Sequence, residues 1–123
     1  RREAEEVERW NLIHPHKTPR ISHLESCLSK HSVPTVAVSD YVKMVSEQIG
    51  PYVPGPYYAL GTDGFGRSDT RENLRHFFEV DRYYIVLTAI RALVTEGNLD
   101  IKVAEEVIKK YNINPEKPSP ITL

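Results

Sequence analysis

The order of apolar patterns along the chain predicts a mixed α/β protein built around a parallel sheet. Two short runs rich in β-branched or aromatic residues, 33–38 and 57–60, flank a segment whose apolar residues have helical spacing. Two strands joined through a helix pair in parallel with a right-handed crossover, and buried parallel strands need cover on both faces. We expect the helices that precede the first strand to supply part of that cover.

The first thirty residues favour two helices. Ala4, Val7 and Trp10 recur at helical spacing among charged residues, which predicts an amphipathic helix over residues 2–13. Two prolines follow, and each removes a backbone donor and constrains its predecessor, so the helix ends there. A second short helix is expected from Pro19 to near residue 30, with the preceding threonine as its cap.

The first strand leads directly into the next helix. Ser39 and Asp40 are expected to cap that helix, and the Gly-Pro pair that starts at Gly50 is expected to end it. Only the weak segment 77–80 offers a third strand. Because two strands are too few for a stable parallel sheet, we expect the remaining strands to precede Arg1.

The last third of the chain is predicted to be helical. Asp81 is expected to cap a helix that ends at Gly97, and Asn98 and Asp100 are expected to start another. The proline-rich tail from Asn114 is predicted to be surface coil.

Composition indicates one soluble domain. The chain has 123 residues, and 16 Lys plus Arg against 17 Asp plus Glu give a net charge of −1, which argues against nucleic-acid binding. No apolar run approaches the ~18 residues of a membrane span, so we expect a cytoplasmic protein. Cys27 is the only cysteine and is expected to be buried. The chain starts at Arg1 inside an expected helix, which predicts a piece of a longer protein.

The stretch after the second strand is the strongest candidate for a binding loop. It follows the carboxyl end of a parallel strand, where open α/β sheets place their ligand loops. Three glycines within six residues indicate positive φ angles or close chain approach, and the charged side chains suit ion pairs within the loop or across an interface. A purely structural loop is the alternative. The candidate residues are Gly61, Asp63, Gly64, Phe65, Gly66, Arg67, Asp69, Arg71 and Arg75.

Familiar catalytic patterns are missing from the sequence. The glycine spacing is not G-x-G-x-x-G, no G-K-[ST] follows, and Ser68 has no G-x-S-x-G elbow to support a triad with a histidine and an acid. The histidines lack a nearby acidic or cysteine ligand set for zinc. They are His14, His16, His23, His31 and His76. We therefore assign no catalytic, cofactor-binding or metal-binding residue.

Longer runs of sequence carry a family resemblance. They read LGTDGFGRSD at 60–69, RENLR at 71–75 and FEVD at 78–81, with VERWN at 7–11 and TPR at 18–20 further upstream. Together with SDY at 39–41 and YVP at 52–54, they resemble the C-terminal domain of the bacterial homodimeric pyruvate dehydrogenases. The resemblance covers essentially the whole chain.

The resemblance implies a fold and a parent activity. The implied fold is a transketolase C-terminal-domain-like three-layer α/β/α sandwich with a mainly parallel sheet, truncated at its N-terminal side. Residues 1–123 would be a single domain that forms the C-terminal part of it. The parent enzyme, an oxidoreductase of pyruvate metabolism, uses thiamine diphosphate and Mg²⁺ to decarboxylate pyruvate and reductively acetylates a lipoyl group. The family holds its cofactor between other domains, so we expect this chain to bind none.

Three functions remain open at this point. The first is a structural and assembly domain whose partners are the remainder of the same chain and the second subunit of a homodimer. The second is a docking module for the dihydrolipoamide acetyltransferase component. The third is the equivalent domain of another transketolase-like enzyme, such as transketolase itself. Unpaired strand edges in an isolated fragment also predict self-association.

Overall fold

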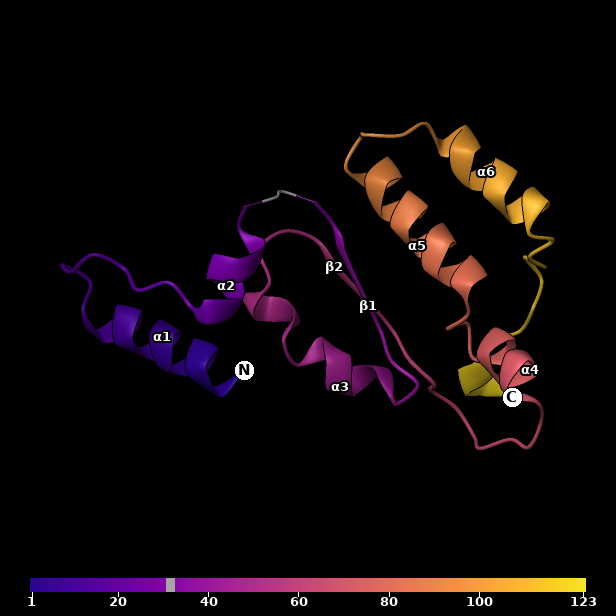
Figure 1. Ribbon diagram of the computed structural model, residues 1–123, viewed down its shortest axis with the longest axis horizontal. Helices are drawn as coiled ribbons and strands as arrows, with labels where there is room; N and C mark the ends of the chain where they lie inside the picture. Colours follow the sequence, from indigo (N-terminus) through magenta and orange to yellow (C-terminus); the bar gives the residue numbers. More distant parts are fainter. Residues whose placement is uncertain (31–32) are drawn as a thin grey trace.

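The computed structural model describes residues 1–30 and 33–123 (Figure 1). His31 lies outside the described residues. In chain order the elements are α1 (Arg2–Ile13), α2 (His23–Leu28), β1 (Thr35–Val38), α3 (Lys43–Glu47), the 3₁₀ turn η1 (Gly50–Tyr52), β2 (Tyr57–Leu60), α4 (Arg71–Phe77), α5 (Arg82–Thr95), α6 (Ile101–Lys110) and the 3₁₀ turn η2 (Pro120–Thr122). No helix among these residues is long and apolar enough to cross a membrane.

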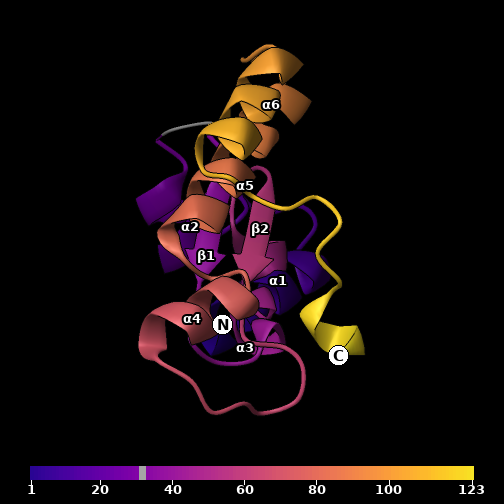
Figure 2. The same ribbon diagram turned by 90° about the vertical axis from the view of Figure 1, so that its right-hand side faces the viewer.

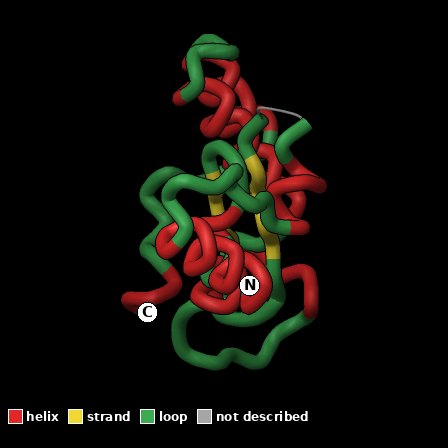
Figure 3. Tube along the Cα trace, turned by 90° about the vertical axis from the view of Figure 1, so that its left-hand side faces the viewer, coloured by secondary structure: helices red, strands yellow, loops and turns green. Residues whose placement is uncertain are grey.

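The two strands pair in parallel, as the sequence predicts. Thr35 lies opposite Tyr57 and Val38 opposite Leu60, so both strands end at the same edge. Helix α5 packs against both strands and α3 packs against β2, on opposite sides of the pair in Figure 1. The tube view places the strands near the middle of the molecule with helical segments around them (Figure 3). Helix α1 packs mainly against α2, so the cover of the strands comes from α3 and α5.

The caps of the two long C-terminal helices are confirmed. Asp81 Oδ1 accepts hydrogen bonds at 3.0 Å from the backbone N–H groups of Tyr83 and Tyr84, at the start of α5. Asp100 Oδ1 accepts one at 2.9 Å from the N–H of Lys102, at the start of α6. Each carboxylate satisfies donors that have no partner within the helix, which is why these two starts are readable from sequence.

The two short helices before β2 begin later than predicted. Helix α2 starts at His23 with Ser22 as its cap, because the Asn11 side chain pairs with both backbone groups of Arg20 (2.8 and 2.9 Å) and keeps that segment extended. Helix α3 starts at Lys43 because Thr62 N–H donates to the Tyr41 carbonyl at 2.9 Å. Tertiary hydrogen bonds thus occupy backbone groups that a longer helix would use.

The predicted third strand at 77–80 is wrong. Residues 71–77 instead form helix α4, whose last residue is Phe77, and Thr70 Oγ1 caps its start by accepting a hydrogen bond at 3.3 Å from the Asn73 N–H. Glu79 adopts φ 60°, and Val80 N–H closes back on the Arg75 carbonyl at 2.9 Å. This left-handed closure ends a helix and turns the chain toward α5.

Two predictions about burial are also wrong. Cys27 is exposed rather than buried, with its Sγ 3.6 Å from His23 Nε2. The tail is not merely surface coil, because Pro120 is buried and residues 120–122 form η2. Neither Cys27 nor Pro120 belongs to a periodic apolar pattern. The sequence therefore carried no signal for the burial of the tail.

Gly61 is the point of closest approach between the chain after β2 and the start of α3. A Cβ atom at Gly61 would lie 2.5 Å from Lys43 N and 2.7 Å from the Tyr41 carbonyl oxygen. Both neighbours are backbone atoms, so they cannot move aside as a flexible side chain would. By contrast, a Cβ at Gly66 would meet no atom within 4 Å.

We expect Gly61→Ala to lower the free energy of unfolding by about 1–3 kcal/mol, because the added methyl group forces the β2 exit away from α3. Gly66→Ala is the matched control and is expected to change stability by less than about 1 kcal/mol. Urea unfolding followed by circular dichroism measures both. Equal effects of the two substitutions would contradict the close approach.

Tyr84 is a half-buried residue of α5 whose phenol is poorly hydrated. Burial raises the pKa of Tyr84 to about 12 from its ordinary value of 10.0, and the carboxylates of Glu79 and Asp81 add to the shift. The folded chain therefore holds this proton at a pH where the unfolded chain has released it.

We expect the free energy of unfolding to fall as pH rises from about 10 to about 12, because only the unfolded state then gains by ionising Tyr84. Below this window both states hold the proton and Tyr84 adds no pH dependence. Urea midpoints of the parent chain and of Tyr84→Phe, compared across the window, isolate the contribution of this group. The prediction fails if both proteins lose the same stability over that range.

Candidate functional site

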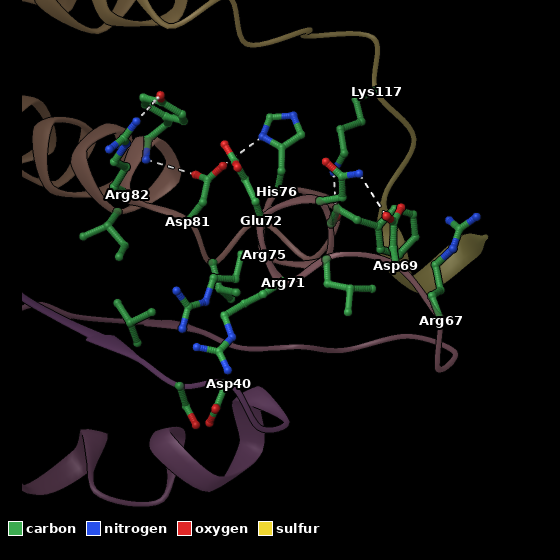
Figure 4. Close-up of a pocket in the computed structure, with 18 of the residues that line it drawn as sticks. Asp40, Arg67, Asp69, Arg71, Glu72, Arg75, His76, Asp81, Arg82 and Lys117 are labelled. Carbon is green, nitrogen blue, oxygen red and sulfur yellow. Dashed lines mark hydrogen bonds and ion pairs between the residues drawn. The ribbon is translucent and has the colours of Figure 1, made fainter.

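An open groove of about 1570 Å³ lies beyond the end of β1 (Figure 4). Its walls come from the end of β1, the loop after β2, α4, the start of α5 and the C-terminal tail. The charged or titratable residues that line it are Asp40, Arg67, Asp69, Arg71, Glu72, Arg75, His76, Asp81, Arg82 and Lys117, and Tyr83 lines it too. The groove therefore occupies the edge where parallel sheets present their binding loops.

The structure separates the nine candidate residues into two groups. Four of them line the groove: Arg67, Asp69, Arg71 and Arg75. The others belong to the loop that leads to the groove but do not line it: Gly61, Asp63, Gly64, Phe65 and Gly66. Figure 2 shows this loop as a wide arc that projects beyond the helices. The charged members are thus gathered, whereas the glycines shape the path that brings them there.

Asp69 organises the start of α4. Its Oδ1 accepts hydrogen bonds from the Thr70 backbone N–H at 2.7 Å and from Asn73 Nδ2 at 2.9 Å. The hydrogen bond from Asn73 lowers the pKa of Asp69, and the Thr70 bond and the positive charge of Arg67 act in the same direction. Asp69 is therefore an ionised carboxylate at neutral pH, because the hydrogen bonds to its Oδ1 favour the charged form.

Arg71 and Arg75 lie one turn apart on α4 and extend toward Asp40 at the end of β1 (Figure 4). Both are exposed. Neither takes part in an ion pair or a side-chain hydrogen bond within the described ranges 1–30 and 33–123. Two guanidinium groups with spare donors on one side of a groove suit recognition of carboxylates on another polypeptide.

His76 and Asp81 form the groove's acid–base pair. His76 Nδ1 lies 2.8 Å from Asp81 Oδ2, while Oδ1 of the same carboxylate caps α5. No hydrogen bond between described residues joins Ser68 to His76, so Ser68 does not form the nucleophile–base contact of a triad with this pair. The geometry supports a structural role in which Asp81 fixes the imidazole against the start of α5.

Sequence reasoning missed several groove residues, among them Lys117 and Asp40, which come from parts of the chain far from the loop. Lys117, from the tail, donates hydrogen bonds at 2.8 Å to the Phe77 carbonyl and to Glu79 Oε1. Asp40 lies at the groove because β1 ends there, although the sequence predicts only a helix cap at that position. Nothing local could have revealed Lys117, because 38 residues separate it from Glu79.

The described residues offer no ligand set for the Mg²⁺ that the family resemblance implies for a longer protein. In the part of the chain that the structure describes, no three His, Cys, Asp or Glu side chains are grouped to hold a metal ion. Asp69 and Asp81 already accept backbone and side-chain hydrogen bonds. His14 is stacked on Trp10 with ring centroids 4.4 Å apart, and neither residue lines the groove.

Comparison with known proteins agrees with this architecture. The sequence model of the transketolase-like TK C-terminal domain matches residues 7–81. A protein of Cupriavidus necator named pyruvate dehydrogenase E1 component is 54% identical over 122 residues, which are 99% of this chain and 14% of that protein. The proteins of the same name from Pseudomonas aeruginosa and Escherichia coli are 50% and 47% identical and cover 98% and 97% of this chain.

The chain spans only about one seventh of the length of these relatives, since it covers 14% or 13% of each. The family match includes the second half of α1, both strands and α4, and the relatives also cover the rest of the chain beyond residue 81. The chain therefore belongs to the transketolase-like C-terminal domain family, and within it resembles the domain carried by proteins named pyruvate dehydrogenase E1 component.

Proposed function

We propose that this chain is the structural and assembly domain of a pyruvate dehydrogenase decarboxylating component. The complete enzyme would decarboxylate pyruvate with thiamine diphosphate and Mg²⁺ and pass the acetyl unit to the lipoyl group of a dihydrolipoamide acetyltransferase. Support comes from relatives named pyruvate dehydrogenase E1 component that cover 97–99% of this chain. Those names favour this parent over transketolase itself. A cytoplasmic location is part of the proposal, and the free cysteine suits it.

The observation that carries this proposal is the amount of surface left uncovered. The chain exposes 9012 Å², whereas a folded monomer of 14.1 kDa exposes about 6,700 Å². The excess of about 2,300 Å² is of the size that permanent interfaces hide. No large side chain among the described residues is fully buried, and the buried core consists mainly of small residues.

The uncovered surface is apolar at several separate places. Leu12 on α1 is 79% exposed, and Met44 on α3 is 64% exposed. Phe65, on the loop of residues 61–70 between β2 and α4 (the glycine loop), is 77% exposed. The two-stranded pair also has two unpaired edges. Apolar patches and free strand edges on one small domain are typical of surfaces that other polypeptide segments cover. In the proposal, further strands from the same protein extend the sheet and the second subunit covers the remaining faces.

A docking module for the acetyltransferase component is the second candidate. It is favoured by Arg71 and Arg75, whose guanidinium groups make no ion pair within the described residues and line an open groove. A partner with carboxylates at matching spacing would find spare donors there. In the assembly proposal the second subunit reaches the groove, whereas in the docking proposal the acetyltransferase component does.

A truncation of the proposed full-length enzyme separates the candidates. We expect removal of residues 1–123 to abolish pyruvate decarboxylation and to dissociate the dimer, because about 2,300 Å² of interface is lost. Activity is measured with thiamine diphosphate and Mg²⁺, and dimerisation by sedimentation velocity. The separate 123-residue chain is added back as the control.

Retained activity in the truncated enzyme would refute an essential assembly role and favour docking. Loss of activity with an intact dimer would instead place the glycine loop at the active site. Only combined loss of activity and of the dimer agrees with the assembly proposal.

Charge reversal in the groove tests which partner it meets. We expect Arg71→Glu with Arg75→Glu to weaken subunit association by on the order of tenfold to a hundredfold, because like charges then face each other across the interface. The matched control is Lys109→Glu with Lys110→Glu, an exposed pair at the end of α6. If binding of the acetyltransferase component weakens while the dimer is unchanged, the groove belongs to docking.

A further inference from the structure

The C-terminal tail makes a contact that its sequence does not predict. The Lys117 ammonium donates hydrogen bonds at 2.8 Å to the Phe77 carbonyl oxygen and to Glu79 Oε1. Its side chain is only 16% exposed, and its Nζ lies 5.6 Å from the ring centroids of both Phe77 and Tyr84. A lysine ordered in this way gives up side-chain freedom, so its charge-assisted bonds must hold the tail in place.

The end of α4 supplies the acceptors for this lysine. Carbonyl groups in the last turn of a helix have no partner within the helix. Glu79, with φ 60°, turns the chain sharply after Phe77, which leaves the Phe77 carbonyl and the Glu79 carboxylate on the side where Lys117 arrives. The Lys117 contact is thus a specific anchor point and not a loose surface pair.

Three residues beyond Lys117, the tail packs against the glycine loop at Gly64. Pro120 is buried, and its carbonyl oxygen lies 2.5 Å from the position that a Cβ atom of Gly64 would occupy. Gly64 also has φ 126°, a backbone conformation that residues with a side chain rarely adopt. The ring of Phe78 closes the same spot at 3.6 Å from that position. The loop and the tail therefore fit together only because Gly64 lacks a side chain.

Arg67, at the other end of the glycine loop, contacts the ring of Phe77, which Lys117 also approaches. The Arg67 guanidinium lies 4.1 Å from the ring centroid of Phe77, which packs edge-on against Phe78 at 4.9 Å. Between Gly64 and Arg67 the loop is open, and Phe65 is 77% exposed. The loop is thus held at Gly64 by the tail and at Arg67 by a ring that Lys117 also approaches.

We propose that residues 114–123 form a strap that holds the glycine loop in place, with Lys117 as its latch. Lys117 is a positioning residue, since it acts on the loop through Phe77 and Pro120. The strap presents Phe65 and Arg67 as a preformed surface for a partner polypeptide, a consequence that rests on the proposed assembly function. A preformed loop binds without the cost of ordering at the interface.

The test is site-resolved proteolysis of the 123-residue chain. We expect Lys117→Met to accelerate trypsin cleavage after Arg67 on the order of tenfold, because a released loop opens more often. Cleavage after Arg91, in the middle of α5, reports global unfolding and is expected to stay unchanged. Mass spectrometry quantifies both bonds. Lys102→Met is the matched control, because Lys102 is an exposed lysine whose side chain makes no hydrogen bond or ion pair among the described residues.

Glu79→Gln serves as a milder variant, since it removes the charge that faces Lys117 and keeps the shape. Selective acceleration after Arg67 in either variant supports the strap. An unchanged rate after Arg67 in Lys117→Met overturns it, and so does equal acceleration after Arg67 and Arg91 in both variants.

A second measurement separates the strap from the proposed assembly function. Lys117→Met in the proposed full-length enzyme is expected to weaken subunit association by on the order of tenfold, while Lys102→Met leaves it unchanged. If the loop is released in the 123-residue chain but association is unaffected, the strap stands and the loop's place in the assembly surface is wrong.

Discussion

The parallel pairing of β1 with β2 is the constraint on which the remaining structure depends. Each strand has four residues, and in register they end together at Val38 and Leu60. The chain must therefore cross back through α3 between them, and the segments that leave the two strands emerge side by side. That juxtaposition brings Thr62 to the Tyr41 carbonyl and allows no side chain at Gly61.

Everything beyond the strand ends is arranged by loops rather than by further sheet. The chain leaving β2 makes the wide glycine loop, enters α4 and turns at Glu79 into α5, which packs back on the strands. The groove is the space enclosed by this path. Asp81 caps α5 and Asp69 binds the Thr70 N–H and the Asn73 side chain at the start of α4, whereas the side chains of Arg71 and Arg75 make no hydrogen bond or ion pair among the described residues.

The small core and the large exposed area have one physical origin. A two-stranded parallel pair has two open edges. A single helix on each side would not cover both faces of a sheet widened by further strands. The apolar side chains on α1, α3 and the glycine loop are consequently left for other polypeptide segments to bury. An assembly role accounts for these exposures together, and the groove and the tail then shape one part of the assembly surface.

The sequence by itself determined the elements whose signals are local. Asp81 and Asp100 cap their own helices, and β-branched and aromatic runs form the two strands, so α5, α6, β1 and β2 were predictable, as was the family from its longer runs. The tertiary structure decided where α2 and α3 begin and the place of Lys117 in the groove. Those features depend on hydrogen bonds between residues as far apart as 40 positions, which no local pattern encodes.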